Sequence, residues 1–173
     1  MDALDALKTR RSCRAYLDRP VDAQTLDAII EAGRFAASGM GRQPVTFVAV
    51  TDPATVKQLS RMNAQIMGVD TDPFYGAQTV VVVLVDANVP TCVEDGALAM
   101  GNLMNAAHAL GVDSCWVHRA REEFESKEGR ALLASWGLPS DGSLRGVGHC
   151  ILGYAAGPAS EPKPRRDNVV YVK

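Results

Sequence analysis

Residues 80–85 read VVVVLV (Val80–Val85), an unbroken run of apolar and mostly β-branched side chains. A strand that is buried on both faces has this composition, because neither of its sides meets water. We therefore expect the segment to form the central strand of a sheet that other layers cover on both sides. The run is the longest apolar stretch of the chain, and it is far too short to cross a lipid bilayer, which takes about 20 residues.

Helical and strand periodicities alternate along the chain on either side of this strand. The pattern predicts helices over residues 3–9, 23–36, 53–67, 93–110 and 122–136, and strands over residues 45–50, 114–117, 147–152 and 169–172. Asp22 and Asp52 are the expected N-caps of two of the helices. In the first helix Leu4 and Leu7 are expected to point inward, and the helix over 93–110 is expected to be buried nearly all round. Because several helices are long and the strands are few, an α+β layered fold is favoured over a regular doubly wound one.

The composition is that of an ordinary globular protein, with 173 residues of which 47% are hydrophobic and 22% charged. It excludes collagen-like, disordered and membrane-spanning proteins. A chain of this length buries roughly 70% of the surface that its unfolded form exposes, which suffices for one core. We expect a single domain over residues 1–173. The N-terminus lacks a secretory signal pattern and the four cysteines lack CxxC or metal-ligand spacing, so we expect reduced thiols and a cytoplasmic location.

Charge is distributed unevenly along the chain. The net charge of -2 argues against nucleic acid as a partner, since such binders carry a surplus of Lys and Arg. Residues 1–20 and 161–173 nevertheless hold nine basic against five acidic residues, a net charge of +4, while the middle holds nine against fifteen, a net charge of -6. If the fold brings the two ends together, their basic residues form one compact anion site.

The most specific local feature is the run Arg10-Arg11-Ser12-Cys13-Arg14. Its guanidinium groups and hydroxyl suit a phosphate monoester, which accepts several charge-assisted hydrogen bonds. A solvated basic helix end explains the run equally well, because cations favour helix C-termini. Lys163 and Arg165 flank Pro164 in a stiff, extended segment, which suits either a ligand clamp or a charged, solvated tail.

Two further places hold candidate binding residues. Residues 39–44 read GMGRQP, whose glycines allow backbone amides to approach a planar ligand or a phosphate. The segment is not a dinucleotide fingerprint, because its strand follows the glycines instead of preceding them. His118 comes directly after a predicted strand, where functional groups often lie, whereas His108 and His149 are interpreted as structural. With no convincing triad, carboxylate pair or metal cluster, any chemistry is expected to belong to a cofactor.

Four segments together resemble the FMN-dependent nitroreductase family. RRSCRAY (10–16) resembles the family's Arg-Arg-Ser-x-Arg-aromatic start, and AASGMGRQPVTFVAV (36–50) resembles its Ala-Pro-Ser-x-x-Asn-x-Gln-Pro-Trp segment. GNLMNAAHALGVDSCWVH (101–118) resembles its long buried helix and following strand, and ILGYAAGPASEPKPRR (151–166) resembles its Gly-Tyr then Lys-Pro-Arg ending. The resemblance implies an α+β, nitroreductase-like three-layer fold, in which a central mixed β-sheet is flanked by helices and the C-terminal strand is exchanged with a dimer partner.

The resemblance also implies where FMN binds, at the interface of a homodimer. The residues that it assigns to the phosphate, the ribityl chain and the pyrimidine edge are Arg10, Arg11, Ser12 and Arg14, with Lys163 and Arg165 completing the phosphate site. Those that it places against the flavin from the other subunit are Ser38, Gly39, Met40, Gly41 and Gln43, and those along the opposite ring face near N5 are Trp116, Val117, His118 and Arg119.

The chain departs from the family's pattern at several of these positions. Gly41 stands where the family usually has an asparagine, so the backbone amide of Gly41 is expected to approach the ring instead. Val45 replaces a tryptophan, Ala37 replaces a proline, and His118-Arg119 replaces the Glu-Gly of the bacterial nitroaromatic reductases.

The activity that the resemblance implies is FMN-dependent oxidoreduction in two half-reactions. NADH or NADPH gives a hydride to flavin N5, and a nitroaromatic, quinone or similar small molecule then takes the electrons. No side chain is required as an acid or base, so neither a catalytic residue nor a metal is assigned. One alternative is an FMN-binding protein without turnover, such as a flavin store, redox sensor or electron-transfer partner. Another is reductive removal of a substituent or fragmentation of flavin, which the short segment between residues 67 and 80 disfavours because such reactions need a closed pocket.

Overall fold

The computed structural model describes residues 1–173 and is built around one four-stranded sheet. Its strands are β1 (Val45–Val50), β2 (Thr79–Asp86), β3 (Asp113–Val117) and β4 (Leu144–Gly153), in the spatial order β1-β2-β4-β3. All three ladders are antiparallel, and the only parallel pairing is an isolated bridge between Ser12 and Ser114 at the β3 edge. The prediction that residues 80–85 form a central, fully buried strand is confirmed, since each of them is 0% exposed within β2.

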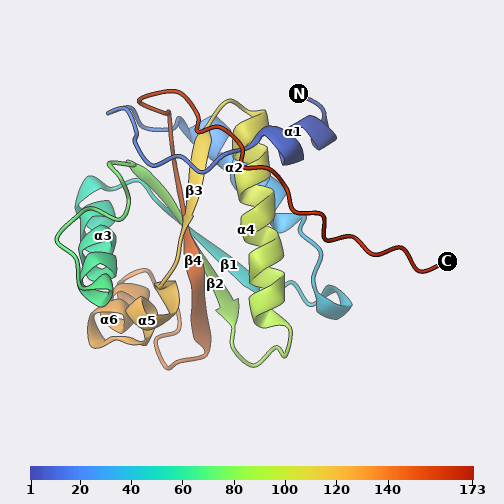
Figure 1. The fold of residues 1–173 in the computed structure, drawn as a ribbon. Helices are drawn as coiled ribbons and strands as arrows, with labels where there is room; N and C mark the ends of the chain where they lie inside the picture. The colour runs from blue at the N-terminus through green and yellow to red at the C-terminus, as the bar shows by residue number, and fades with distance from the viewer.

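Helices cover both faces of the sheet (Figure 1), which confirms the three-layer α+β fold. On one face, α2 (Ala23–Arg34) and α4 (Cys92–Ala109) pack against one alternate set of β2 side chains, Val81, Val83 and Val85. On the other face, α3 (Pro53–Met67), α5 (Ala120–Glu125) and α6 (Lys127–Ser135) pack against the second set, Val80, Val82 and Leu84. The short helix α1 (Ala3–Thr9) contacts α4, and a single 3-10 turn, η1 (Gly39–Gly41), precedes β1.

The helix starts follow from local sequence. The side chain of Asp22 accepts a hydrogen bond from the backbone N–H of Thr25 (2.9 Å), and that of Asp52 accepts one from Thr55 (2.8 Å), as predicted for N-caps. Pro53 occupies the first turn of α3, where its missing N–H costs nothing.

Two predictions about helix burial are wrong for the single chain. Leu4 and Leu7 are 62% and 60% exposed, because only Ala6 of α1 faces the body of the protein. Helix α4 buries one face against the sheet and leaves Val93 and Leu98 exposed at its surface, so it is not buried all round.

The predicted helix over 122–136 is two helices, α5 and α6, which Ser126 separates. Ser126 has an extended backbone, and its hydroxyl oxygen accepts a hydrogen bond from the N–H of Gly129 (3.0 Å) as the N-cap of α6. The chain turns so tightly there that a Cβ at Gly129 would collide with the Glu123 carbonyl. A serine inside an amphipathic pattern therefore acts as a cap instead of a helix-interior residue.

The C-terminal tail forms no strand within the chain. Residues 169–172 are exposed, and the tail runs away from the body to the C-terminus (Figure 1). Strand β1 lies at one edge of the sheet with no neighbour on its outer side. Exchange of the C-terminal strand with a partner stays a prediction. Among the helices, none combines the length and apolar character that crossing a membrane requires.

Candidate functional site

The basic N-terminal run lies against the start of β3. The backbone N–H of Cys13 donates to the Ser114 carbonyl (3.0 Å), next to the parallel bridge between Ser12 and Ser114. Arg10 is half-buried, and its Nη1 is buried without any hydrogen-bond partner. A buried guanidinium nitrogen is costly to leave unpaired, so this position is suited to an anionic group that accepts from it.

The other residues of this run differ in their roles. Nη1 of Arg11 donates to the carbonyls of Lys8 (2.9 Å) and Arg10 (2.8 Å), so this side chain also closes the C-terminal end of α1. Arg14 is exposed and makes no ion pair. Arg11 therefore supports a helix end, which is one of the two interpretations of the run, while binding of a phosphate by Arg10 and Arg14 stays a prediction.

A cavity of about 290 Å³ lies beside this run. It is lined by residues 11–15, by Asp113 at the start of β3, and by Ala155 and 157–160 at the start of the C-terminal tail. The structure thus brings the beginning of the tail to the N-terminal basic run. Lys163 and Arg165 lie beyond it on the exposed tail, where they contact no carboxylate.

The far end of β3 carries the second predicted group. Val117 is buried, and Trp116 packs so closely on β4 that a Cβ at Gly148 would collide with its indole nitrogen. That nitrogen is buried and has no partner. His118 is exposed, and Arg119 adopts the left-handed conformation with φ 76°. The start and end of β3 are about 13 Å apart at the usual rise per residue, so the two groups line one elongated sheet edge.

The third predicted group, residues 38–43, lies elsewhere. It precedes β1, the strand at the edge opposite β3, and the Gly39 N–H donates to Oδ1 of Asp95 near the start of α4 (2.8 Å). Met40 is 86% exposed. The Gly41 N–H donates to the Ser38 carbonyl (3.0 Å), and its approach to the ring stays a prediction. Within one chain, the structure therefore brings together the first two groups but not the third.

Sequence reasoning missed a buried polar cluster behind the end of β3. Asn63 of α3, Glu123 of α5 and His149 of β4 are each 0% exposed. Nε2 of His149 lies 2.8 Å from Oε2 of Glu123, and Nδ2 of Asn63 donates to Oε1 of Glu123 (2.5 Å) and to the His118 carbonyl (2.7 Å). Burial raises the pKa of Glu123 to about 8 and lowers the pKa of His149 to about 3, so both groups are neutral at pH 7.

One signal for this cluster was present in the sequence. Asn63 follows Val56 and Leu59 at helical spacing, which places it on the buried face of α3. The interpretation of His149 as structural is confirmed by its burial. His108 is only half-buried, with its Nε2 2.8 Å from the Thr9 hydroxyl, because it lies on the side of α4 next to α1.

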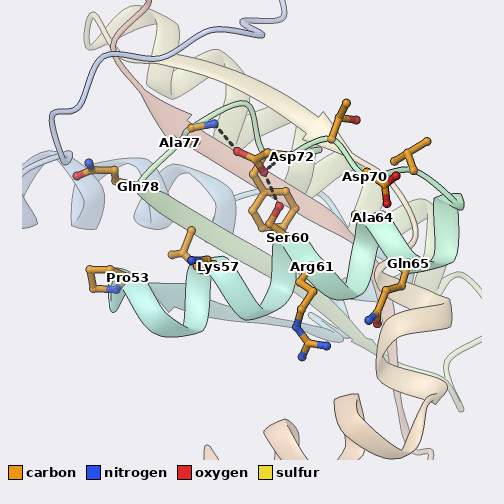
Figure 2. A pocket seen from close by; sticks show the side chains of 15 residues that line it. Pro53, Lys57, Ser60, Arg61, Ala64, Gln65, Asp70, Asp72, Ala77 and Gln78 are labelled. Carbon is orange, nitrogen blue, oxygen red and sulfur yellow. Dashed lines mark hydrogen bonds between the residues drawn. The ribbon is translucent and has the colours of Figure 1, made fainter.

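A cavity of about 740 Å³ lies between α3 and residues 69–78, and none of the predicted site residues line it. Figure 2 shows Asp72 at its back, where the carboxylate accepts from the Ser60 hydroxyl and from the N–H groups of Phe74 (2.8 Å) and Gly76 (2.7 Å). These polar groups satisfy one another and leave no unpaired atom for a ligand. The edge along β3, with its unpaired Arg10 and Trp116 nitrogens, is the better candidate site.

The fold and this edge define a class of protein: a three-layer α+β chain with a basic N-terminal segment beside an edge strand. Residues 7–81 match the Nitroreductase family. A relative from Archaeoglobus fulgidus with the provisional name NADH dehydrogenase/NAD(P)H nitroreductase is 30% identical over 145 residues, which are 81% of this chain and 79% of that protein. The chain belongs to the nitroreductase family.

Other similarities are consistent with this assignment. A relative from Methanothermobacter thermautotrophicus with the same provisional name is 29% identical over 120 residues, 67% of this chain but only 60% of that protein's length. The crystal structure of a Bacteroides fragilis nitroreductase with bound FMN has a TM-score of 0.90 and 29% identity, and the match covers 100% of both chains.

Proposed function

We propose that this chain is an FMN-dependent NAD(P)H oxidoreductase of the nitroreductase type that acts as a homodimer. The observation that carries the proposal is the unpaired, buried Nη1 of Arg10 at the start of β3. An anionic ligand there would satisfy a donor that the protein leaves unpaired, and a phosphate monoester matches it in charge. The FMN-bound relative from B. fragilis supports FMN as the source of that phosphate.

The residues present fit such a ligand along the β3 edge. Arg10, Ser12 and Arg14 would bind its phosphate and ribityl chain, with Arg11 fixing the segment that carries them. Lys163 and Arg165 would reach the same phosphate from the tail that starts at the neighbouring cavity. Trp116, Val117, His118 and Arg119 would line one face of the ring.

When bound, FMN supplies a two-electron carrier that takes a hydride from NADH or NADPH and passes it to a nitroaromatic, quinone or similar acceptor. The contribution of the chain is binding, orientation and electrostatics. The cationic groups of the N-terminal run would stabilise added negative charge on a ligand held beside them. No side chain near the β3 edge is required to transfer a proton.

A second copy of the chain is part of the proposal. Residues 38–43 lie at the sheet edge opposite the other two groups, so in this proposal Ser38, Gly39, Met40, Gly41 and Gln43 of one chain would approach the FMN held by the other. Exposed apolar side chains support such an interface, and they are gathered on α1, α4, the end of α2 and the tail: Leu4, Leu7, Phe35, Leu98, Leu110, Val170 and Tyr171. The free outer side of β1 would accept the C-terminal strand of the partner.

The proposal treats residues 1–173 as one FMN-binding domain, which the single sheet supports. It places the protein in the cytoplasm, which the four free cysteines support.

The test is an absorbance spectrum of the purified protein, repeated anaerobically as NADH or NADPH is added. Flavin bands that bleach on addition of either nucleotide are expected. Bands that persist unbleached would instead favour an FMN carrier or sensor that another reductase serves. A protein that binds no flavin even when FMN is supplied would refute the proposal.

A further inference from the structure

The turn between β3 and α5 has a conformation that its sequence does not favour. Arg119 lies at φ 76°, in the left-handed region that residues with a Cβ adopt at a cost. Such a residue keeps this conformation only where its surroundings hold it there, and functional sites are where this often occurs. Arg119 is also the N-cap residue of α5, so its backbone sets the direction of the chain as it leaves the β3 edge.

Asn63 holds this turn from one side. Its Nδ2 donates to the carbonyl of His118, the peptide group directly before Arg119, at 2.7 Å. The second hydrogen of the same nitrogen goes to Oε1 of Glu123 (2.5 Å). A flipped amide would turn its oxygen toward two acceptors, so the pair of contacts fixes the orientation of Asn63.

Two neighbours hold the cluster from the other side. Oε2 of Glu123 lies 2.8 Å from Nε2 of His149, which projects from β4 at the position paired with Val117. The backbone at the start of α5 lies against Gly146 of β4 so closely that a Cβ there would collide with the Ala120 carbonyl. The turn is thus clamped between a hydrogen bond from α3 and the backbone of β4.

Stability alone does not explain a polar cluster at this place. Oδ1 of Asn63 and Nδ1 of His149 are buried without partners, and each unpaired atom costs free energy. Apolar side chains of similar size would fill the same space without that cost. What the cluster achieves, and apolar residues would not, is a directed hydrogen bond to one backbone carbonyl.

We propose that Asn63, oriented by Glu123 and His149, is a positioning residue that sets the backbone of the His118–Arg119 turn against the flavin ring. The inference rests on the proposed function for the identity of the ligand, but the hold on the turn is a property of the chain itself. Asn63 acts through the His118 carbonyl and does not touch the ligand.

The test compares Asn63→Leu with Ser60→Ala. Both variants lose hydrogen bonds made by a buried side chain of α3. Asn63→Leu loses the two to His118 and Glu123, whereas Ser60→Ala loses the one to Asp72, away from the turn. Backbone amide chemical shifts of His118, Arg119 and Ala120 are measured in the FMN-free chain. The affinity for FMN and the visible circular dichroism of the bound FMN are measured in the holoprotein. We expect Asn63→Leu to move these amide shifts, to alter the flavin dichroism and to weaken FMN binding about tenfold, the equivalent of one hydrogen bond.

Two further variants separate positioning from general destabilisation. Glu123→Gln keeps an acceptor for Asn63 and is expected to preserve the flavin dichroism. Arg119→Gly is made alone and together with Asn63→Leu, and the two proteins are expected to have the same flavin dichroism, because glycine takes a positive φ without the penalty that arginine has and so does not need Asn63 to hold the turn.

If the amide shifts in Asn63→Leu match those in Ser60→Ala, Asn63 does not hold the His118–Arg119 turn and the proposal is overturned. Shifts that move while the flavin dichroism and affinity stay unchanged would overturn its role toward the ring, as would a double variant whose flavin dichroism differs from that of Arg119→Gly alone. A wild-type chain that binds no FMN would refute the proposed function instead, and the amide shifts would still decide whether Asn63 positions the turn.

Discussion

Glu123 and His149 make the stability of the folded chain fall as the pH rises above 6.5, and one substitution should abolish that fall. The pKa of Glu123 is raised from 4.5 to about 8 and that of His149 is lowered from 6.5 to about 3, both by burial. Between about pH 3 and pH 8 the folded pair therefore holds one titratable proton, on the carboxyl group of Glu123. In the unfolded chain both groups titrate at their ordinary values.

The free energy of unfolding then changes with pH by the difference in bound protons. Between pH 4.5 and 6.5 each state holds one proton, so the pair contributes no slope. Above pH 6.5 the unfolded chain holds none while the folded chain holds one, so stability falls by about 1.4 kcal/mol per pH unit. From pH 6.5 to 8 the loss is about 2 kcal/mol. Below pH 4.5 the pair holds two protons in the unfolded chain and one in the folded chain, so stability falls as the pH is lowered further.

Glu123→Gln removes the fall in unfolding free energy above pH 6.5. It keeps the contacts with Asn63 and His149, because a glutamine amide resembles the protonated carboxyl group. Urea unfolding of both proteins, followed by the fluorescence of Trp116 and Trp136, gives the unfolding free energy at each pH, with protein and FMN concentrations held fixed. We expect the wild-type curve to fall by about 2 kcal/mol relative to the variant between pH 6.5 and 8. Parallel curves over that interval would show that Glu123 is ionised in the folded protein and would refute the reasoning.

Three further predictions concern the FMN site and the dimer. Arg10→Glu combined with Lys163→Glu is expected to abolish FMN binding while the melting temperature stays near that of the FMN-free wild-type protein. Lys57→Glu with Arg130→Glu, which makes the same change in charge away from β3, is the control, and a yellow charge-reversed protein would contradict the phosphate assignment. Gly148→Ala should destabilise the fold by about 1–3 kcal/mol, since its Cβ would collide with the Trp116 indole, whereas Gly157→Ala has open space and should leave the urea midpoint unchanged. Val170→Asp with Val172→Asp should shift the protein from dimer to monomer in light scattering and lower its FMN content, because a charged tail would not pair with β1; an unchanged dimer would argue against strand exchange.

Much of the fold could be predicted because the deciding signals are local. The run 80–85 is apolar on both sides, so it had to lie between the two helical layers. Asp22 and Asp52 cap their helices by accepting hydrogen bonds from residues three positions further along the chain. The break at Ser126 was missed, because whether a serine caps a helix or lies within it depends on the packing of Gly129 against Glu123. The inward orientation of Leu4 and Leu7 was wrong because an apolar helix face does not specify what it packs against.

The candidate site was predictable in part for the same reason. The run from Arg10 to Arg14 and His118 at the end of a strand were recognised from residue type and order, and Arg119 from the family resemblance. Nothing local indicates that the arginine run lies at the other end of the strand that His118 follows. Nor does local sequence indicate that residues 38–43 lie at the opposite edge of the sheet.

By itself the sequence determined the central strand, the caps at Asp22 and Asp52 and the two basic ends, because each depends on side-chain chemistry or on spacing within a few residues. It also indicated the family, through four short segments that occur in the family's order. Only the tertiary structure decided that Arg10 has a buried nitrogen without a partner, that Asn63, Glu123 and His149 meet, and that Arg119 is held in a left-handed turn. Those features arise where α3, α5 and the strands β3 and β4 pack together. Burial and the pairing of distant polar groups are set by that packing and by no segment alone.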